Sequence, residues 1–398
     1  MRRRLLLAVT LLIPMAPAAD AAAGWSADRA QTRAGSAGQV VAVGGDAGRV
    51  ALAWRRTSGG TQRLEVRLGR APGAFTRAPR VLDRSARPLG TPVATPLRGG
   101  AFGVAWLRSA AGANRVRLTT VDREGRRGPT IAATTSGQPA YDLEWVPGPV
   151  PVLTWSRESR ADGLELAPTG PRAVRLPSSP RSEPGLVADT AGLATVTWID
   201  AARVLVSDRS GRSFTQPLNL SMGDVNRTEV VRATGATLVF WRQGSDLMVA
   251  SRPDGGSFGP PRLLLTETTD AARVAVTALG DVLVVAPVGD SSNVGLLQLL
   301  RLGPDGTPRL PPQALGRGRL AQLAVDGRGG AFVAWMGESA ARTITARRIP
   351  AGDGLGAPVR LAARTDFGRR PTLAATREGG AVAAWVAGGA VHARTYAP

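Results

Sequence analysis

The amino-acid sequence predicts an all-β protein, a single β-propeller built from repeated four-stranded blades. Three observations carry this prediction: a short β-prone run ending in tryptophan recurs, most repeats lie 43 to 52 residues apart, and glycine and proline are dense. A repeat of about 47 residues with four short strands is typical of a propeller blade. The 49 glycines and 30 prolines, without any long stretch of helical periodicity, exclude helical repeats.

The first 23 residues have the three parts of a secretory signal peptide. Residues 2–4 are arginine, residues 5–15 are mostly apolar, and residues 16–23 are mostly small. The apolar run is shorter than the roughly 20 residues that cross a bilayer, and no later run is longer. We therefore expect cleavage before Gly24, a propeller domain over residues 24–398, and a secreted protein, extracellular or associated with the cell wall, exported by the Sec or the twin-arginine route.

The marker strand of each unit ends in a tryptophan. The series is Trp54, Trp106, Trp155, Trp198, Trp241, Trp335 and Trp385. The interval of 94 residues between the fifth and sixth members spans two units, and the run 282–286 takes the place of the missing marker. Eight marker strands predict eight blades, with seven as the alternative because the unit ending at Ala286 is degenerate. We expect these tryptophans to pack between blades.

The two ends of the chain complement each other. The last unit contains an inner strand near 371–375, a turn at 378–380, the marker strand and one further strand from residue 390. Residues 25–43 supply material for the outer and inner strands that are missing before Trp54. We therefore expect N- and C-terminal strands to share the last blade and close the ring, which removes open sheet edges.

Two segments resemble the Asp-box turns of sialidase-type propellers, whose pattern is Ser-x-Asp-x-Gly-x-Thr-Trp. Residues 207–214 and 251–258 keep the serine, the glycine, a small hydroxyl residue and an aromatic residue. Arg209 and Pro253 stand in place of the aspartate. The chain is thus similar to secreted bacterial repeat proteins of the sialidase-like, degenerate Asp-box type. The resemblance implies a propeller, and sialidase chemistry would add a tyrosine nucleophile beside a carboxylate, an acid/base aspartate and three arginines.

Only two tyrosines are available for such chemistry. Tyr396 lies two residues from the end, and Tyr141 stands where other units have a core aliphatic residue, such as Leu373. We expect Tyr141 to be buried in the core. Asp142 and Glu144, which replace small residues on the same strand, are the one hint of catalysis.

Most catalytic chemistry is excluded by composition. His392 is the only histidine and cysteine is absent, which excludes Cys/His zinc sites and Ser-His or Cys-His nucleophile systems within one chain. Hydrolysis by two carboxylates stays open, because such a pair needs only proximity in space. Asp-Gly pairs at 305–306, 326–327 and 353–354 are ordinary turn residues and lack the spaced oxygen ligands of calcium loops. We expect no metal site and no cofactor.

Charged residues recur in the connection that enters each inner strand, on the propeller face where ligands usually bind. Arginine forks suit carboxylate, phosphate and sulfate groups. The candidate ligand-binding residues are Arg87, Asp224, Arg227, Asp270, Arg273, Asp366 and Arg370. A second charged set follows the marker strands on the same face: Arg56, Arg108, Arg157, Glu158, Asp200, Arg242, Asp246, Asp290 and Glu338. The alternative is that repeated charges tie each blade to the next.

All 50 basic residues are arginine, and the formal net charge is +20. Such a charge attracts polyanions outside the cell, although a GC-rich genome would also enrich arginine. Aromatic residues make up 5%, so no base-stacking platform for nucleic acid is visible. We predict a monomeric, non-catalytic secreted propeller that binds an acidic glycan, a wall polymer or a protein. The alternative is a sialidase-like glycoside hydrolase acting on extracellular glycans.

Overall fold

The computed structural model describes residues 24–32, 36–75, 78–110, 113–134, 139–157, 161–167, 169–177, 185–189, 192–210, 213–270, 272–289, 294–338, 342–366 and 370–398. Within these residues the chain is all-β, apart from one 3₁₀ turn, η1 (Arg98–Gly100). The all-β prediction is therefore confirmed. The expected signal peptide lies outside the described residues, as do Glu158 and Asp290 of the second charged set.

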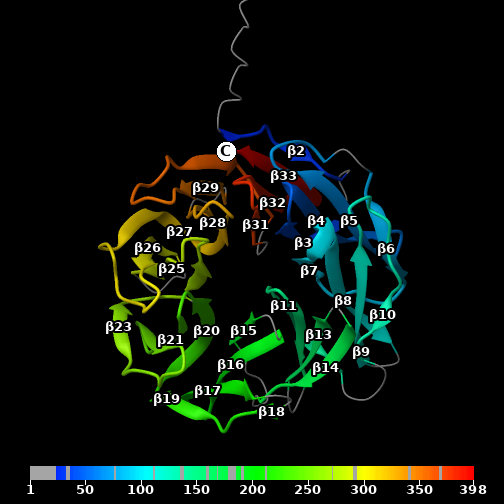
Figure 1. Ribbon diagram of the computed structural model, residues 1–398. Helices are drawn as coiled ribbons and strands as arrows, with labels where there is room; N and C mark the ends of the chain where they lie inside the picture. Colours follow the sequence, from blue (N-terminus) through cyan, green and yellow to red (C-terminus); the bar gives the residue numbers. More distant parts are fainter. Residues whose placement is uncertain are drawn as a thin grey trace, which may run out of the picture.

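The strands form antiparallel sheets that stand around a central opening (Figure 1). Within a sheet, most strands pair with the next strand along the chain, and two-residue turns or short loops join many of these neighbours. Four sheets contain four strands each: β3 (Ser36–Gly44), β4 (Arg49–Ser58), β5 (Thr61–Arg70) and β6 (Arg80–Ser85); β7 (Val93–Pro96), β8 (Phe102–Ala110), β9 (Ala113–Val121) and β10 (Ile131–Ala132); β11 (Tyr141–Val146), β12 (Val152–Ser156), β13 (Ala161–Ala167) and β14 (Gly170–Arg175); β20 (Val225–Ala233), β21 (Ala236–Gln243), β22 (Asp246–Pro253) and β23 (Arg262–Leu265).

Three larger sheets are variations on this unit. One five-stranded sheet contains β15 (Gly185–Asp189), β16 (Gly192–Asp200), β17 (Arg203–Ser210), β18 (Ser213–Phe214) and β19 (Leu218–Met222). The seven-stranded sheet contains β24 (Arg273–Val276), β25 (Val282–Val288), β26 (Gly295–Leu302), β27 (Gln313–Val325), β28 (Ala331–Met336), β29 (Ile344–Ile349) and β30 (Val359–Ala362). The other five-stranded sheet contains β31 (Thr372–Ala375), β32 (Ala381–Ala387) and β33 (Ala390–Ala397) with β1 (Gly24–Trp25) and β2 (Arg29–Ala30). The long strand β27 pairs with β26 through residues 313–318 and with β28 through residues 319–325. One strand thus serves two successive four-stranded units.

Strands from both ends of the chain share one sheet. In β1, Gly24 pairs with Ala397 of β33, and in β2, Arg29 pairs with Ala393. The Trp25 ring packs edge-on against Tyr396, with ring centroids 5.5 Å apart. The N-terminal segment therefore supplies the outer strands of the C-terminal sheet (Figure 1).

The marker tryptophans fill the spaces between sheets. Trp54 of β4 is fully buried and packs in one apolar cluster with Val382 of β32. Trp106 of β8 is likewise buried, in a cluster with Leu64 of β5. The predicted packing role of these tryptophans is confirmed. Ala286 of β25 stands where the other units have the marker tryptophan, and it is also buried.

Arginines on the third strand of several sheets bind the backbone of the sheet before. Their guanidinium groups donate to backbone carbonyl oxygens at exposed or partly buried positions. These outer arginines are structural rather than free surface charge. The pairs are Arg67 with Gln31 at 3.0 Å, Arg347 with Ala314 at 3.1 Å, and Arg394 with Leu361 at 3.2 Å.

Two other sheet junctions use carboxylates instead. Arg209 of β17 pairs with the fully buried Glu165 of β13, and Arg252 of β22 pairs with Asp208 of β17. Burial alone would raise the pKa of Asp208, but hydrogen bonds from Arg252 and Thr195 hold this pKa below its ordinary value. Each of these arginines therefore links its own sheet to the preceding one.

The structure corrects the prediction for Tyr141, which is 39% exposed rather than buried. A bulge between Tyr141 and Glu144, with Asp142 at a φ of 43°, shifts the register of β11. The position that Leu373 takes opposite β32 is taken here by Trp145, which lies opposite Leu153 and is buried. The bulge thus moves Tyr141 beyond the core.

Candidate functional site

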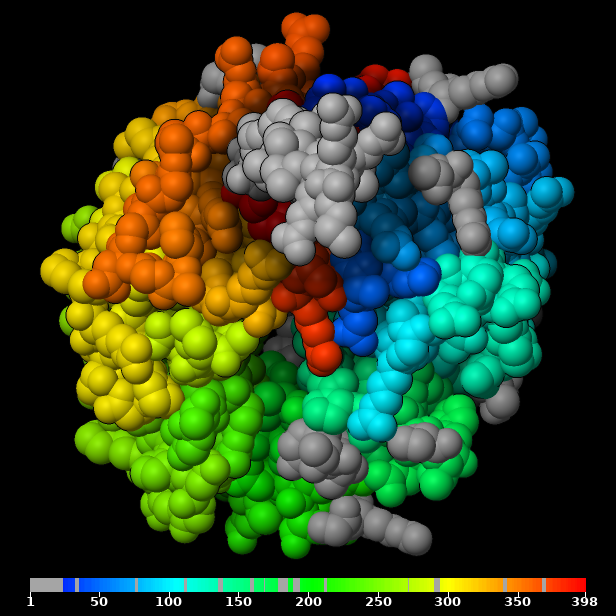
Figure 2. Space-filling view, turned by 45° about the horizontal axis from the view of Figure 1, so that its top comes forward, coloured from blue at the N-terminus to red at the C-terminus, as the bar shows by residue number. Residues whose placement is uncertain are grey.

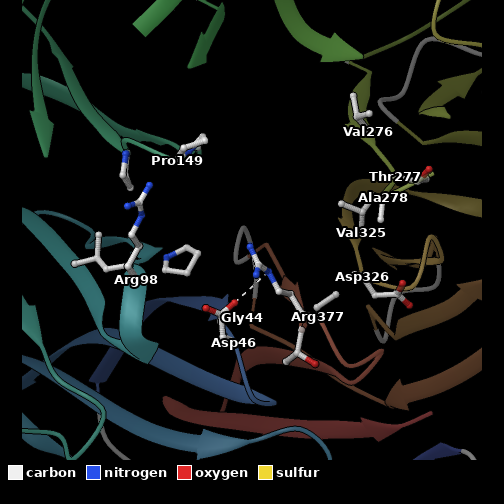
Figure 3. A pocket seen from close by; sticks show the side chains of 18 residues that line it. Gly44, Asp46, Arg98, Pro149, Val276, Thr277, Ala278, Val325, Asp326 and Arg377 are labelled. Atoms are coloured by element: carbon white, nitrogen blue, oxygen red, sulfur yellow. Dashed lines mark ion pairs between the residues drawn. The ribbon is translucent and has the colours of Figure 1, made fainter. Parts of the chain in front are cut away.

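A cavity of ≈ 610 Å³ lies at one end of the inner strands. Its wall includes Gly44, Val276, Val325 and Ala375, the last residues of β3, β24, β27 and β31. The space-filling view shows the molecule hollowed at the centre of the ring, and the close-up shows residues from several sheets around the opening (Figures 2 and 3). Because its wall draws on so many sheets, the cavity exists only when the sheets are assembled.

Two arginines in the wall come from different sheets. Arg98 lies in η1, directly after β7, and Arg377 lies in the turn after β31 (Figure 3). The Arg377 Nε atom is 3.1 Å from Asp46 Oδ1, an exposed ion pair. Exposed pairs of this kind contribute little to stability, about 0 to 1 kcal/mol, and exchange readily with other ions. Both guanidinium groups are therefore available to an incoming anion.

Other polar side chains around the cavity accept hydrogen bonds from backbone amides in turns. Asp326 is buried, and its Oδ1 accepts hydrogen bonds from the backbone amides of Arg328 and Gly330. Thr376 accepts in the same way from the amide of Gly380 at 3.2 Å. This is the turn chemistry that the sequence predicts for residues 326–327.

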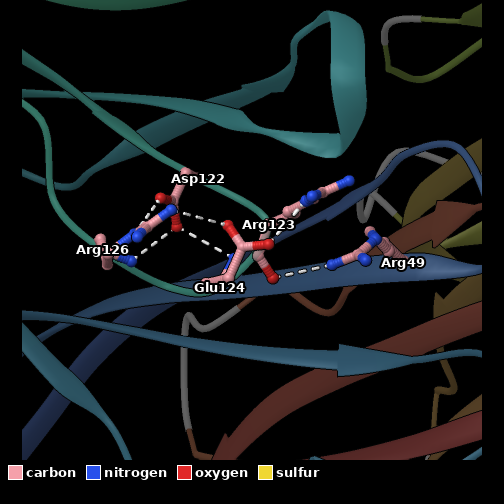
Figure 4. Close-up of polar contacts among 5 residues, drawn as sticks. All are labelled: Arg49, Asp122, Arg123, Glu124 and Arg126. Atoms are coloured by element: carbon pink, nitrogen blue, oxygen red, sulfur yellow. Dashed lines mark hydrogen bonds and ion pairs between the residues drawn. The ribbon is translucent and has the colours of Figure 1, made fainter.

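A charged cluster lies on the turn between β9 and β10 (Figure 4). Arg126 Nε is 2.7 Å from Asp122 Oδ2, and the hydrogen bond from Arg126 lowers the pKa of Asp122. Arg123 pairs with Glu124, while Arg49 of β4 donates to the carbonyl oxygen of Arg123 at 2.7 Å. The cluster therefore pairs both of its carboxylates with arginines and joins two successive sheets.

The predicted site residues lie at the opposite ends of the inner strands from this cavity, because each precedes or opens its strand. Arg87, Asp224 and Arg227 are exposed. Arg227 has a φ of 48° and lies at a bulge of β20 between Asn226 and Thr228. These three side chains face solvent, as a binding role requires.

The remaining predicted residues are partly engaged with the fold. Arg273 Nη1 lies 3.8 Å from Glu229 Oε1, a contact between β24 and β20. Both carboxylate oxygens of Asp366 accept backbone amides in the β32–β33 turn, from Gly388 at 2.9 Å and Gly389 at 3.1 Å. The two half-buried residues that complete the set are Asp270 and Arg370. For Asp366 the structure adds a turn-capping role that the sequence pattern does not predict.

The second charged set mainly joins sheets or hairpins. Arg108 of β8 is 3.0 Å from Asp83 of β6, in the preceding sheet. Glu338 is 2.8 Å from Arg317 of β27. These contacts support the alternative that repeated charges tie neighbouring units together.

The sequence pattern does not predict Arg98 and Arg377 as site residues. Both lie in short glycine-containing turns between the first and second strands of their sheets, where the sequence resembles any tight turn. The available signal was an arginine one or two residues before a Gly-Gly pair, at residues 98–100 and 377–380.

The solved structures to which the chain is similar include a β-propeller and a prolyl oligopeptidase. The Dos1 propeller matches with a TM-score of 0.53 and 11% identity, covering 94% of this chain and 95% of that one. The chain has the β-propeller fold. Apo prolyl oligopeptidase B from Galerina marginata matches with a TM-score of 0.54 and 11% identity, covering 88% of this chain and 56% of that chain, so the similarity spans just over half of that enzyme. At such identities the likeness concerns the fold alone.

No family model and no curated protein matches the sequence. Within the described part of the propeller, no three histidine, aspartate or glutamate side chains gather as a metal site. The described residues also contain no helix long and apolar enough to cross a membrane.

Proposed function

We propose that this chain is a secreted, non-catalytic β-propeller that binds an anionic polymer, an acidic glycan or wall polymer, at the ends of its inner strands. The observation that carries the proposal is the charge around the cavity. Arg98 and Arg377 present guanidinium groups there, while Asp46 is paired with Arg377 and Asp326 is used by turn amides. An anion that enters the cavity can therefore accept hydrogen bonds from guanidinium groups, which suit carboxylate and sulfate groups.

The predicted residues at the opposite strand ends form the second part of this proposal. Exposed Arg87 and Arg227, together with Arg273 and Arg370, would contact the polymer at the other mouth of the channel. Asp224, Asp270 and Asp366 would orient these arginines or accept ligand hydroxyls. The net charge of +20 supports long-range attraction of a polyanion to either end. A protein with an acidic surface is the alternative partner.

Chromatography on a sulfated polysaccharide column tests which end binds. Replacing Arg98 and Arg377 by glutamine should lower the eluting salt more than replacing two exposed outer arginines, Arg70 and Arg360. Replacing Arg87, Arg227, Arg273 and Arg370 should lower it more than replacing Arg70, Arg80, Arg175 and Arg360. Retention should weaken with salt, because exposed charges are screened over roughly 8 Å at physiological ionic strength.

Elution of both test variants together with their charge-matched controls would contradict the proposal. The positive charge would then act as a diffuse field, and genome composition would explain the arginine content. Arg67, Arg347 and Arg394 are unsuitable as controls, because they bind the backbone of neighbouring sheets.

One observation favours the second candidate function, a sialidase-like glycoside hydrolase. Tyr141 is 39% exposed and shares β11 with the exposed Asp142 and Glu144. Asp142 Oδ2 accepts a hydrogen bond from Ser156 Oγ at 3.1 Å. If this is a hydrolase, the purified protein releases sugar from sialylated glycans and Tyr141→Phe abolishes the release. No release by the parent protein would reject it.

We also propose that the ring has eight blades, formed by residues 24–398 after removal of the signal peptide. Eight four-stranded units can be traced when the two halves of β27 are assigned to separate blades, and β1 and β2 complete the last unit beside β33. A crystal structure with two separate domains, or with a blade count other than seven or eight, would overturn this. N-terminal sequencing of the exported protein should begin at Gly24 or a few residues before it.

A further inference from the structure

Two arginines stand directly opposite each other in the β4–β5 hairpin. Arg56 pairs in register with Arg63, and Arg63 pairs in turn with Arg84 of β6. Opposite residues of an antiparallel pair share one face of the sheet with Cβ atoms about 5 Å apart, where like charges destabilise the pairing. The Nε atoms of Arg56 and Arg63 are buried without a hydrogen-bond partner in the described part of the chain. Within the described residues, neither of these two arginines forms an ion pair.

Both arginines line a cleft of ≈ 500 Å³ between the first sheet and the N-terminal segment after β2. The opposite wall contains Gln31 and Thr32. This wall is held against β33, because the amide of Gln31 donates to Val391 at 2.7 Å and the amide of Val391 donates to Thr32 Oγ1 at 3.0 Å. The cleft is therefore formed before any ligand arrives, which reduces the ordering cost of binding.

The cleft also contains acceptors. Gln31 is 6% exposed, and its Oε1 atom is buried without a hydrogen-bond partner in the described structure. Glu65 is 5% exposed and accepts a hydrogen bond from Trp54 Nε1 at 3.0 Å through Oε2. A buried acceptor without a donor destabilises the protein, so a ligand that donates hydroxyl hydrogen bonds to it gains binding free energy. The cleft thus combines two cationic donors with buried acceptors.

The next sheet shows how the same arrangement is completed by the protein itself. Arg108 and Arg115 are opposite each other in the β8–β9 hairpin, at positions equivalent to Arg56 and Arg63. There the preceding sheet supplies Asp83, which lies 3.0 Å from Arg108. At the cleft the preceding segment supplies the uncharged Gln31 and Thr32 instead.

We propose that this cleft binds a hydroxylated organic acid, such as a single acidic sugar residue. Its oxyanion bridges Arg56 and Arg63, in the place that Asp83 takes beside Arg108, while its hydroxyl groups donate to Glu65 and Gln31. The site takes one acid group and does not depend on polymer binding at the ends of the inner strands. The two proposals therefore fail separately.

Titration calorimetry with sodium glucuronate, sodium sulfate and glucose tests the site at constant ionic strength. Glucuronate should bind the parent protein, sulfate should compete with it, and glucose should do neither. Replacing both Arg56 and Arg63 by glutamine should weaken glucuronate binding about a hundredfold, roughly tenfold for each charge-assisted contact removed. The matched control, with Arg70 and Arg80 replaced by glutamine, should bind like the parent.

Equal binding by the double variant and its control, or no binding by the parent, would overturn the proposal. Binding of sulfate without glucuronate would reject the hydroxylated acid. A measurement without ligand separates a binding role from a structural one: Arg63→Gln should melt no lower than the parent, because it relieves repulsion between like charges. A clearly lower melting temperature would show that Arg63 stabilises the fold, which would contradict the account.

Discussion

Two neighbouring sheet junctions contain an equivalent tryptophan and arginine but differ in the carboxylate that these side chains meet. Where the second sheet meets the first, Asp83 accepts hydrogen bonds from Trp106 Nε1 at 2.9 Å and from Arg108. Where the first sheet meets the last, Trp54 Nε1 donates to Glu65 of its own sheet, and the described residues of the neighbouring sheet place no carboxylate in the cleft beside Arg56. One repeated pattern thus closes a junction in one place and leaves a charged cleft in another.

The largest expected effect concerns what the two junctions share. Trp54→Ala and Trp106→Ala should each cost about 3 to 5 kcal/mol of unfolding free energy, through lost burial and a cavity. Chemical denaturation of both variants measures this loss. A variant as stable as the parent would show that its tryptophan does not hold two sheets together.

Trp335→Ala extends the same test to another junction of the ring. A Cβ atom added at Gly318 of β27 would lie 2.3 Å from Trp335 Cδ1, so the strand passes directly over the ring. The variant should lose a similar amount, about 3 to 5 kcal/mol, in the same denaturation experiment. An exposed Trp335 in a crystal structure would contradict this.

The second prediction distinguishes the closed junction, where Asp83 pairs with Arg108, from the open junction, where Arg56 lines the cleft. Asp83→Asn should destabilise the protein by about 1 to 3 kcal/mol, because the charged acceptor of Trp106 and Arg108 is weakened. Arg56→Gln, at the open junction, should change the unfolding free energy by less than about 0.5 kcal/mol in buffer without organic acids. Equal losses in the two variants would remove the distinction between the junctions.

The smallest expected effect is a pH dependence of stability that comes from Glu378, at the cavity end of the open junction. Glu378 accepts the backbone amides of Ala47 at 2.7 Å and Gly48 at 2.6 Å. Burial alone would raise the pKa of Glu378, but these hydrogen bonds hold it below its ordinary value. The carboxylate thus stabilises the folded state above that ordinary value, and the contribution is lost as the pH falls through the lowered pKa.

Thermal melts from neutral to acid pH, compared with Glu378→Gln, measure this contribution. The variant should melt below the parent at neutral pH, and the difference should shrink in acid. A difference that grows toward low pH would have the wrong sign.

The fold was predictable because its signal is repeated and apolar. Tryptophans at the end of buried strands mark each unit, and even Ala286 could be placed by spacing. The register of β11 was not predictable, because its bulge uses Asp142 at positive φ rather than a glycine that would announce it. The prediction for Tyr141 was therefore wrong.

The candidate site was predictable only in part. The sequence shows which arginines enter the inner strands, but the cavity forms from turns at the other strand ends, brought together only by ring assembly. The spacing of Arg56 and Arg63 recurs at Arg108 and Arg115 and was visible in the sequence. Which pair meets a carboxylate depends on the neighbouring sheet, and single-chain spacing does not report that contact.

We propose that this propeller binds an acidic glycan without cleaving it. The most direct test incubates the purified protein with an array of acidic and neutral glycans and reads both retention and cleavage. We expect retention on acidic glycans that weakens with salt and is reduced in the variant with Arg98 and Arg377 replaced. The glycans should keep their original length. Shortened glycans, or equal retention on neutral and acidic ones, would contradict it.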